Sequence, residues 1–185
     1  MKETFIARVI RGVRHASGLD PKFHRAAGTI ELQLSAIIHT QMGQQYIELG
    51  KKLEKMNIYK GTINCKLDKP LFFKPQEDKG DYIVKDLKWD HDATESFIYI
   101  KAEIEFVDHD IKKDCFIYRP MLNKLSEHPR DILEIICEES PVAYGDQVII
   151  HIDKYKLKEM SLLDKAKLKF NGGDVESLQE VKDED

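Results

Sequence analysis

The chain has 185 residues, of which 42% are hydrophobic, with a formal net charge of −4 and three cysteines. Its length fits one domain with appendages and is enough for a sizeable core. The near balance of acidic and basic residues argues against a general nucleic-acid interface, and the odd, widely spaced cysteines argue against a disulfide framework. No apolar run approaches the roughly 18 residues of a membrane helix, and no signal-peptide core is evident. We therefore expect a soluble, cytoplasmic protein that binds neither nucleic acid nor membranes.

The N-terminal third mixes strand and helix patterns. Residues 5–13 are rich in β-branched side chains and predict a first strand; glycine and proline then predict a loop that runs to Gly28. Residues 29–34 alternate apolar and polar side chains, which predicts a half-buried strand. Residues 46–56 space their apolar side chains as a short helix does, although Gly50 inside it costs about 1 kcal/mol.

The chain from there to residue 153 predicts short strands separated by turns. Apolar, β-branched and aromatic runs between turn residues place these strands at 60–67, 82–89, 96–107, 114–118, 132–137 and 147–152, with a clear alternation of apolar and polar residues in the first. Many short strands with one or two helices predict a mainly β barrel rather than a sheet of βαβ units. We expect residues 1–153 to form one barrel domain.

The C-terminal segment differs in composition. Residues 154–170 are rich in lysine and space their leucines as an amphipathic helix, which is a candidate surface for a protein partner. Residues 171–185 begin with Asn-Gly-Gly and continue as an acidic run, which predicts a flexible tail. We interpret the tail as a solubilising extension; recognition by a secretion or docking machinery is the alternative.

The strongest local candidate for a site is the tetrad Gly61-Thr62-Ile63-Asn64. Because the apolar residues of this strand occupy one face, the Thr62 hydroxyl and the Asn64 carboxamide lie side by side on the other. Two neutral oxygen ligands suit Mg²⁺, which completes its shell with water and phosphate, and Gly61 leaves room for a phosphate to approach. Threonine and asparagine are also ordinary residues on the solvent face of a strand, and the tetrad alone favours that interpretation.

Three segments, in the same order along the chain, resemble the archaeal CTP-dependent riboflavin kinases. Residues 61–67 are similar to the Gly-Thr-Leu-Asn segment of that family, residues 9–18 to its first strand and glycine-rich turn, and residues 133–148 to its closing Glu-Ile-Ile strand and Gly-Asp-Val turn. The opening Arg-Gly-Val-Arg is closer to a set of uncharacterised bacterial relatives. The resemblance implies a six-stranded cradle-loop barrel that transfers phosphate from CTP to riboflavin, with Mg²⁺ as the cofactor.

The resemblance also implies roles for individual residues. Thr62 and Asn64 would hold Mg²⁺, and Glu134 would contact the flavin or act as a base. The positions that match the nucleotide-binding turn are Gly12, Ser17, Gly18, Gly28 and Thr29.

A cluster of basic residues around the first turn is a further candidate for binding phosphate. Arg11 and Arg14 lie near further basic residues of the same segment, namely Lys22, His24 and Arg25. Arginines beside glycines hold phosphates in bidentate fashion, and a solvated loop of ordinary surface charge explains the cluster equally well.

These observations leave three hypotheses. The first is a Mg²⁺-dependent phosphotransferase of the riboflavin-kinase type, acting on a nucleotide and a flavin or similar small molecule. The second is a barrel that binds a flavin or nucleotide without catalysis. The third, which we rank last, is an interaction protein that engages a partner through the first loop or the C-terminal helix.

Overall fold

The computed structural model describes residues 1–11, 29–39, 44–58, 61–89, 91, 94–121, 129–138 and 142–159. Within these ranges the chain forms two α-helices and seven strands. The helices are α1 (Thr29–His39) and α2 (Gln44–Lys55), and the strands are β1 (Lys2–Ile10), β2 (Ile63–Leu67), β3 (Tyr82–Lys88), β4 (Thr94–Phe106), β5 (Ile111–Pro120), β6 (Ile132–Cys137) and β7 (Gln147–Asp153).

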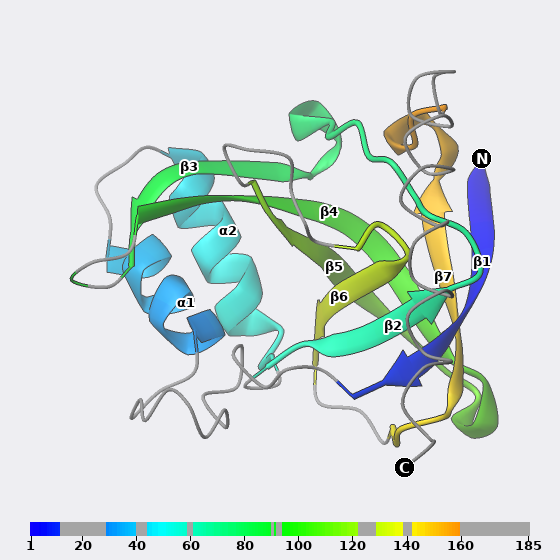
Figure 1. Ribbon diagram of the computed structural model, residues 1–185. Helices are drawn as coiled ribbons and strands as arrows, with labels where there is room; N and C mark the ends of the chain where they lie inside the picture. The colour runs from blue at the N-terminus through cyan, green and yellow to red at the C-terminus, as the bar shows by residue number, and fades with distance from the viewer. Residues whose placement is uncertain are drawn as a thin grey trace, which may run out of the picture.

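Six of these strands close into an antiparallel barrel, which confirms the predicted mainly β barrel with one or two helices (Figure 1). The order around the barrel is β4-β5-β6-β2-β1-β7, and pairing of β7 with β4 completes the ring. The long strand β4 is shared, because Thr94–Tyr99 pairs with β3 and Glu103–Phe106 pairs with β7. Strand β3 therefore extends the sheet outside the closed ring.

The barrel interior is apolar because alternate residues of each strand point inward. On β2, for example, Ile63, Cys65 and Leu67 are buried. Inward residues of the other strands complete this core: Ala7, Val9, Ile100, Ala102, Ile104, Phe106, Cys115, Ile117, Leu133, Ile135, Cys137, Val148, Ile150 and Ile152. The three cysteines are free and buried, and burial raises the pKa of Cys65 to about 12. They are core thiols, which agrees with the expectation that the chain has no disulfide framework.

A second core lies between the two helices and the outer face of the sheet from β3 to β6. Ile37, Leu49 and Leu53 from the helices join aromatic residues of β4 and β5, including Tyr99 and Phe116. This layer is more aromatic than the barrel interior. It leaves the helices on one side of the barrel and β1 and β7 on the other (Figure 1).

Helix α1 occupies the residues for which a strand was predicted at 29–34, and that prediction is wrong. Its buried residues Ile30, Gln33 and Ile37 recur at the spacing of one helix face. Six residues are too few to distinguish the period of a strand, 2, from that of a helix, about 3.6. The apolar residues that continue the helix to His39 favour the helical period. Helix α2 confirms the helix predicted at 46–56.

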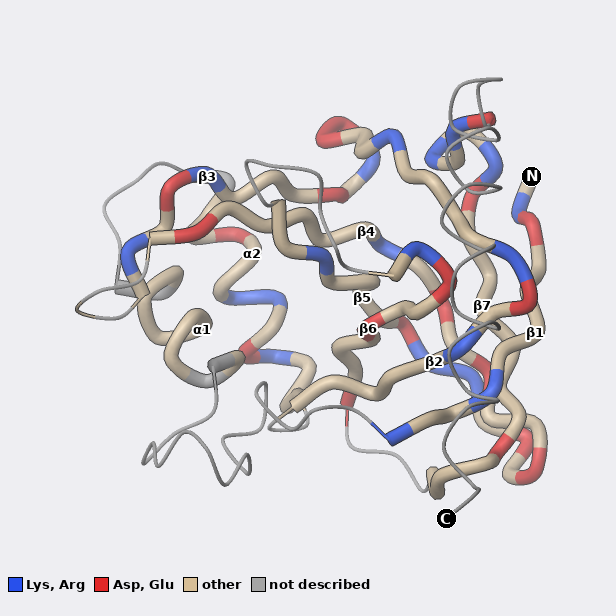
Figure 2. Tube along the Cα trace, viewed as in Figure 1, with Lys and Arg blue, Asp and Glu red and all other residues tan. Residues whose placement is uncertain are grey.

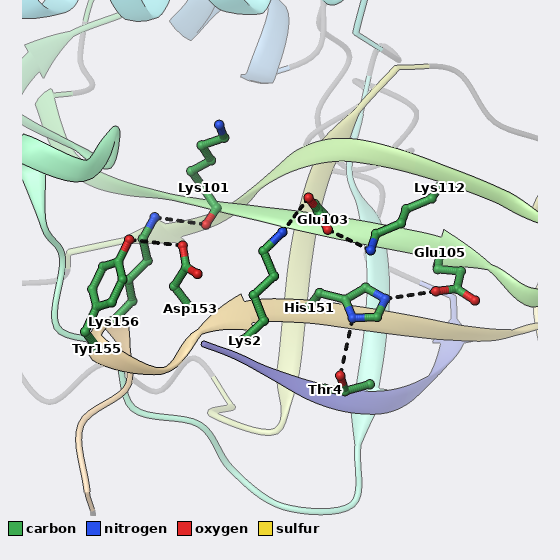
Figure 3. A network of polar contacts seen from close by, with 10 residues as sticks. All are labelled: Lys2, Thr4, Lys101, Glu103, Glu105, Lys112, His151, Asp153, Tyr155 and Lys156. Atoms are coloured by element: carbon green, nitrogen blue, oxygen red, sulfur yellow. Dashed lines mark hydrogen bonds and ion pairs between the residues drawn. The ribbon is translucent and has the colours of Figure 1, made fainter.

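The outer face of β1, β7 and β4 carries a network of polar side chains (Figure 3). The imidazole of His151 contacts Thr4 Oγ1 at 3.3 Å through Nδ1 and Glu105 Oε2 at 2.9 Å through Nε2. Glu103 lies between the ammonium groups of Lys2 and Lys112. Acidic and basic positions are interspersed along the described strands rather than separated by sign (Figure 2).

The segment after β7 packs on the barrel. Lys154–Lys156 form a single 3₁₀ turn, Leu157 bridges to Phe73, and the backbone N–H of Lys158 donates to Phe72 O at 2.8 Å. This differs from the α-helix predicted from residue 154, because the Lys156 side chain is buried in an ion pair with Asp81. The remainder of that predicted helix, and the predicted acidic tail at 171–185, lie outside the described residues.

Candidate functional site

The candidate site begins at the start of β2. Gly61 is buried, and Thr62 and Asn64 are half-buried on the outer face because Ile63 and Cys65 point into the barrel. The Asn64 Nδ2 atom lies 3.4 Å from both the hydroxyl and the backbone carbonyl oxygen of Thr62. The two side chains are therefore neighbours on one face, as the alternation of the strand predicted.

Pairing between strands brings the predicted Glu134 to these two residues. Asn64 is directly opposite Glu134 in the β2–β6 pair, and Glu134 is directly opposite Tyr118 in the β5–β6 pair. Residues directly opposite in an antiparallel pair have side chains on the same face, with Cβ atoms about 5 Å apart. Asn64, Glu134 and Tyr118 thus form a polar row across three neighbouring strands.

The Thr62–Asn64 pair fits two adjacent positions in a Mg²⁺ shell. Octahedral Mg²⁺ binds oxygen at about 2.1 Å, which places neighbouring ligands about 3 Å apart. The observed 3.4 Å between Asn64 Nδ2 and Thr62 Oγ1 is close to this value. Rotating the Asn64 amide by half a turn exchanges its nitrogen and oxygen, so that Oδ1 takes the place of Nδ2 beside Thr62 Oγ1. In the ranges the structure describes, no three His, Cys, Asp or Glu side chains converge in a way that would hold a metal.

Two residues of this region were not predicted from the sequence. Tyr118 continues the polar row beneath α1, where its side chain hydrogen-bonds Gln33. Burial, together with the neighbouring Tyr99, raises the pKa of Tyr118 well above its usual value, so the phenol stays neutral. Gln33 was missed because its segment was assigned to a strand. The signal available in the sequence was a polar residue between Ile30 and Ile37 on an otherwise apolar helix face.

Most of the predicted nucleotide-binding residues, Gly12, Arg14, Ser17, Gly18 and Gly28, lie outside the described residues, and Thr29 is the first residue of α1. The predicted turn before β7 forms backbone hydrogen bonds with the end of β1, the strand that precedes this segment. Gly145 N donates to Val9 O, and Val9 N donates to Asp146 O, both at 2.8 Å. Gly145 has a φ of 98°, which favours glycine there. The Arg8 guanidinium also donates to Gly145 O at 3.1 Å.

No protein-family model matches this chain, and no curated protein matches it. Neither helix in the described part of the chain has the length and apolarity needed to cross a bilayer.

Proposed function

We propose that the chain is a Mg²⁺-dependent phosphotransferase of the riboflavin-kinase type, built on a cradle-loop barrel. It moves the terminal phosphoryl group of a nucleoside triphosphate, CTP or another, to a hydroxyl of riboflavin or a similar small acceptor. The observation that supports this most is the 3.4 Å approach of the Asn64 amide to the Thr62 hydroxyl, with Glu134 directly opposite Asn64.

Phosphoryl transfer requires positioning and charge neutralisation more than covalent chemistry. A Mg²⁺ ion held by Thr62 and Asn64 would supply positive charge to the phosphate oxygens. Glu134 accepts the proton of the acceptor hydroxyl while the hydroxyl oxygen bonds to the γ-phosphorus. The bond from that phosphorus to the bridging oxygen breaks, the nucleoside diphosphate leaves, and Glu134 returns its proton to solvent. Gly61 and the residues of the first turn, including Arg14, are proposed to contact the nucleotide.

The direct test measures FMN formation by the full chain from riboflavin, with CTP or ATP and with or without Mg²⁺. We expect Mg²⁺-dependent turnover that falls about 10²- to 10⁴-fold in Glu134→Gln, the range for loss of a general base. Thr62→Val should also abolish turnover. Thr4→Val provides a matched control, because it makes the same change on the outer face of β1 and should leave the rate unchanged.

Thermal unfolding with each ligand distinguishes this proposal from binding without catalysis. A ligand at about 100 times its Kd stabilises the native state by about 2.7 kcal/mol. Stabilisation by nucleotide or flavin without FMN formation would replace the proposal by a non-catalytic binding barrel. Absence of both turnover and stabilisation would contradict any flavin or nucleotide site.

A further inference from the structure

Gln33 is a buried polar residue on an apolar helix face. Only 2% of its surface is exposed, and Ile30 and Ile37 on the same face of α1 are buried as well. Its side-chain amide hydrogen-bonds Tyr118, while its Oε1 atom has no hydrogen-bond partner in the described part of the protein. The Nε2 end therefore faces Tyr118, and the oxygen is left as an unused acceptor.

The unused acceptor is costly. A buried carbonyl without a donor loses its hydrogen bonds to water and gains none in return, and a leucine at this position would fill the same helix–sheet layer without that cost. Among the described residues, Glu103 Oε2 is also buried, but the Lys112 ammonium lies 2.9 Å from it and satisfies it. Gln33 Oε1 has no such compensation, and this points to a donor that arrives with a ligand.

Gln33 stands at the buried end of the polar row. Asn64 and Glu134 are half-buried, whereas Tyr118 and Gln33 are buried. Two inter-strand steps, roughly 10 Å, separate Asn64 from Tyr118. This span suits one small molecule with its reactive hydroxyl at the Asn64 end and its opposite end at Gln33.

Resting on the proposed function, we propose that Gln33 determines the specificity of this site by accepting, at Oε1, a hydrogen bond from a ring N–H of the acceptor substrate. The matching chemical class is a planar heterocycle with an imide or lactam N–H at the end remote from its reactive hydroxyl. Tyr118 positions the amide by holding its Nε2 end, so that the oxygen faces the ligand. In a flavin the group recognised is the imide N–H of the ring system.

The test compares the Kd of riboflavin with that of 3-methylriboflavin, in which a methyl group replaces the imide hydrogen. Binding is followed by quenching of flavin fluorescence with the full chain in the presence of Mg²⁺. We expect wild-type protein to bind the methylated flavin about 10- to 100-fold more weakly, because the methyl group leaves a buried acceptor unpaired. In Gln33→Leu the two Kd values should agree within about threefold, whereas Gln76→Leu, the same change in the β2–β3 connection, should keep the wild-type ratio.

The possible outcomes separate the inference from the proposed function. Equal binding of both flavins by the wild-type protein, together with FMN formation, would overturn the role of Gln33 and leave the phosphotransferase intact. A wild-type ratio that persists in Gln33→Leu would overturn it as well. If wild-type protein binds neither flavin, the proposed function and this inference both fail. Should Gln33→Leu not fold, Tyr118→Phe is the second variant, and it should reduce the ratio because the amide loses its anchor.

Discussion

Two clusters of buried polar side chains in the described part of the chain differ in how fully they are paired. Asp81 and Lys156 are each 1% exposed; Lys156 Nζ lies 2.5 Å from Asp81 Oδ1 and 3.1 Å from Lys101 O. The carboxylate also accepts backbone N–H groups from Lys101 at 2.9 Å and Gln76 at 2.8 Å. The Gln33–Tyr118 pair has one internal hydrogen bond and leaves Gln33 Oε1 without a partner in the described residues.

This difference separates a structural cluster from a binding cluster. Asp81 joins the start of β3 and the middle of β4 to the turn after β7, across 75 positions of sequence. This cluster leaves no described donor or acceptor for a ligand to satisfy. Figure 3 shows Lys156 beside Lys101 of β4, at the edge of the polar network. The Gln33–Tyr118 pair lies at the end of a polar row and retains an acceptor. We therefore expect substitutions in the first cluster to act on stability and substitutions in the second to act on binding.

Breaking the paired cluster should have the largest effect on stability. Lys156→Met leaves the Asp81 carboxylate buried without its cation, which should lower the free energy of unfolding by about 3–5 kcal/mol. Urea denaturation followed by circular dichroism measures the change. Lys154→Met is the matched control, since its exposed ammonium lies 3.8 Å from Glu3, and it should change stability by less than about 0.5 kcal/mol.

A second variant tests whether the unpaired charge is the cause. Adding Asp81→Asn to Lys156→Met removes the buried charge and keeps one carbonyl acceptor for a backbone N–H, so the double variant should regain more than half of the loss. A Lys156→Met variant as stable as wild type would remove the contrast between the two clusters.

The Glu103 ion pairs on the outer face offer a smaller, pH-dependent comparison with the buried pair. Hydrogen bonds from Lys112 and Lys2, opposed by partial burial, lower the pKa of Glu103 from 4.5 to about 2. Because the folded-state pKa is the lower one, the ionised carboxylate stabilises the fold above about pH 4.5 and loses this contribution as the pH falls toward 2. Glu103→Gln should therefore cost about 1 kcal/mol at pH 7, after allowance for solvent screening, and almost nothing near pH 2.

Urea midpoints of wild type and Glu103→Gln between pH 7 and pH 2 measure this dependence. Asp78→Asn is the control, because its exposed carboxylate lies 3.6 Å from Lys79 in a loose surface pair, and it should leave the midpoint at pH 7 unchanged. A Glu103→Gln difference that stays constant across the whole range would show that the carboxylate acts through packing rather than charge.

The sequence predicted the strands better than it predicted the polar clusters, for a physical reason. Runs of β-branched and aromatic residues mark the strands, and the alternation along β2 places Thr62 and Asn64 on one face, so both can be worked out locally. The first strand ends at Ile10 rather than at residue 13, within the usual uncertainty of element ends. Closure of the barrel by β4 and β7, and the pairing of Asp81 with Lys156, depend on residues far apart in sequence, which no local pattern encodes.

The Gln33–Tyr118 pair was not predicted because residues 29–34 were given the period of a strand instead of that of a helix. Assigning residues 29–34 to a strand placed Gln33 on the solvent side, where a glutamine needs no explanation. On α1 the same residue lies between Ile30 and Ile37 and is buried. The choice of Glu134 as a site residue came from the family resemblance. Its place opposite Asn64 was not predicted, because the register between two strands cannot be derived from the two segments alone.

The smallest expected effect is also the sharpest test of the comparison. The double variant Gln33→Leu with Tyr118→Phe replaces both polar residues by apolar ones of similar shape. It removes their hydrogen bond and the unused acceptor together. Such paired replacements are close to neutral or stabilising, so the free energy of unfolding should change by less than about 1 kcal/mol in urea denaturation. Tyr118→Phe alone should be the less stable variant, because it leaves both polar ends of the Gln33 amide buried without a partner. If the double variant instead lost as much stability as Lys156→Met, Gln33 would be a structural residue, and the reason for assigning its free oxygen to a ligand would be gone.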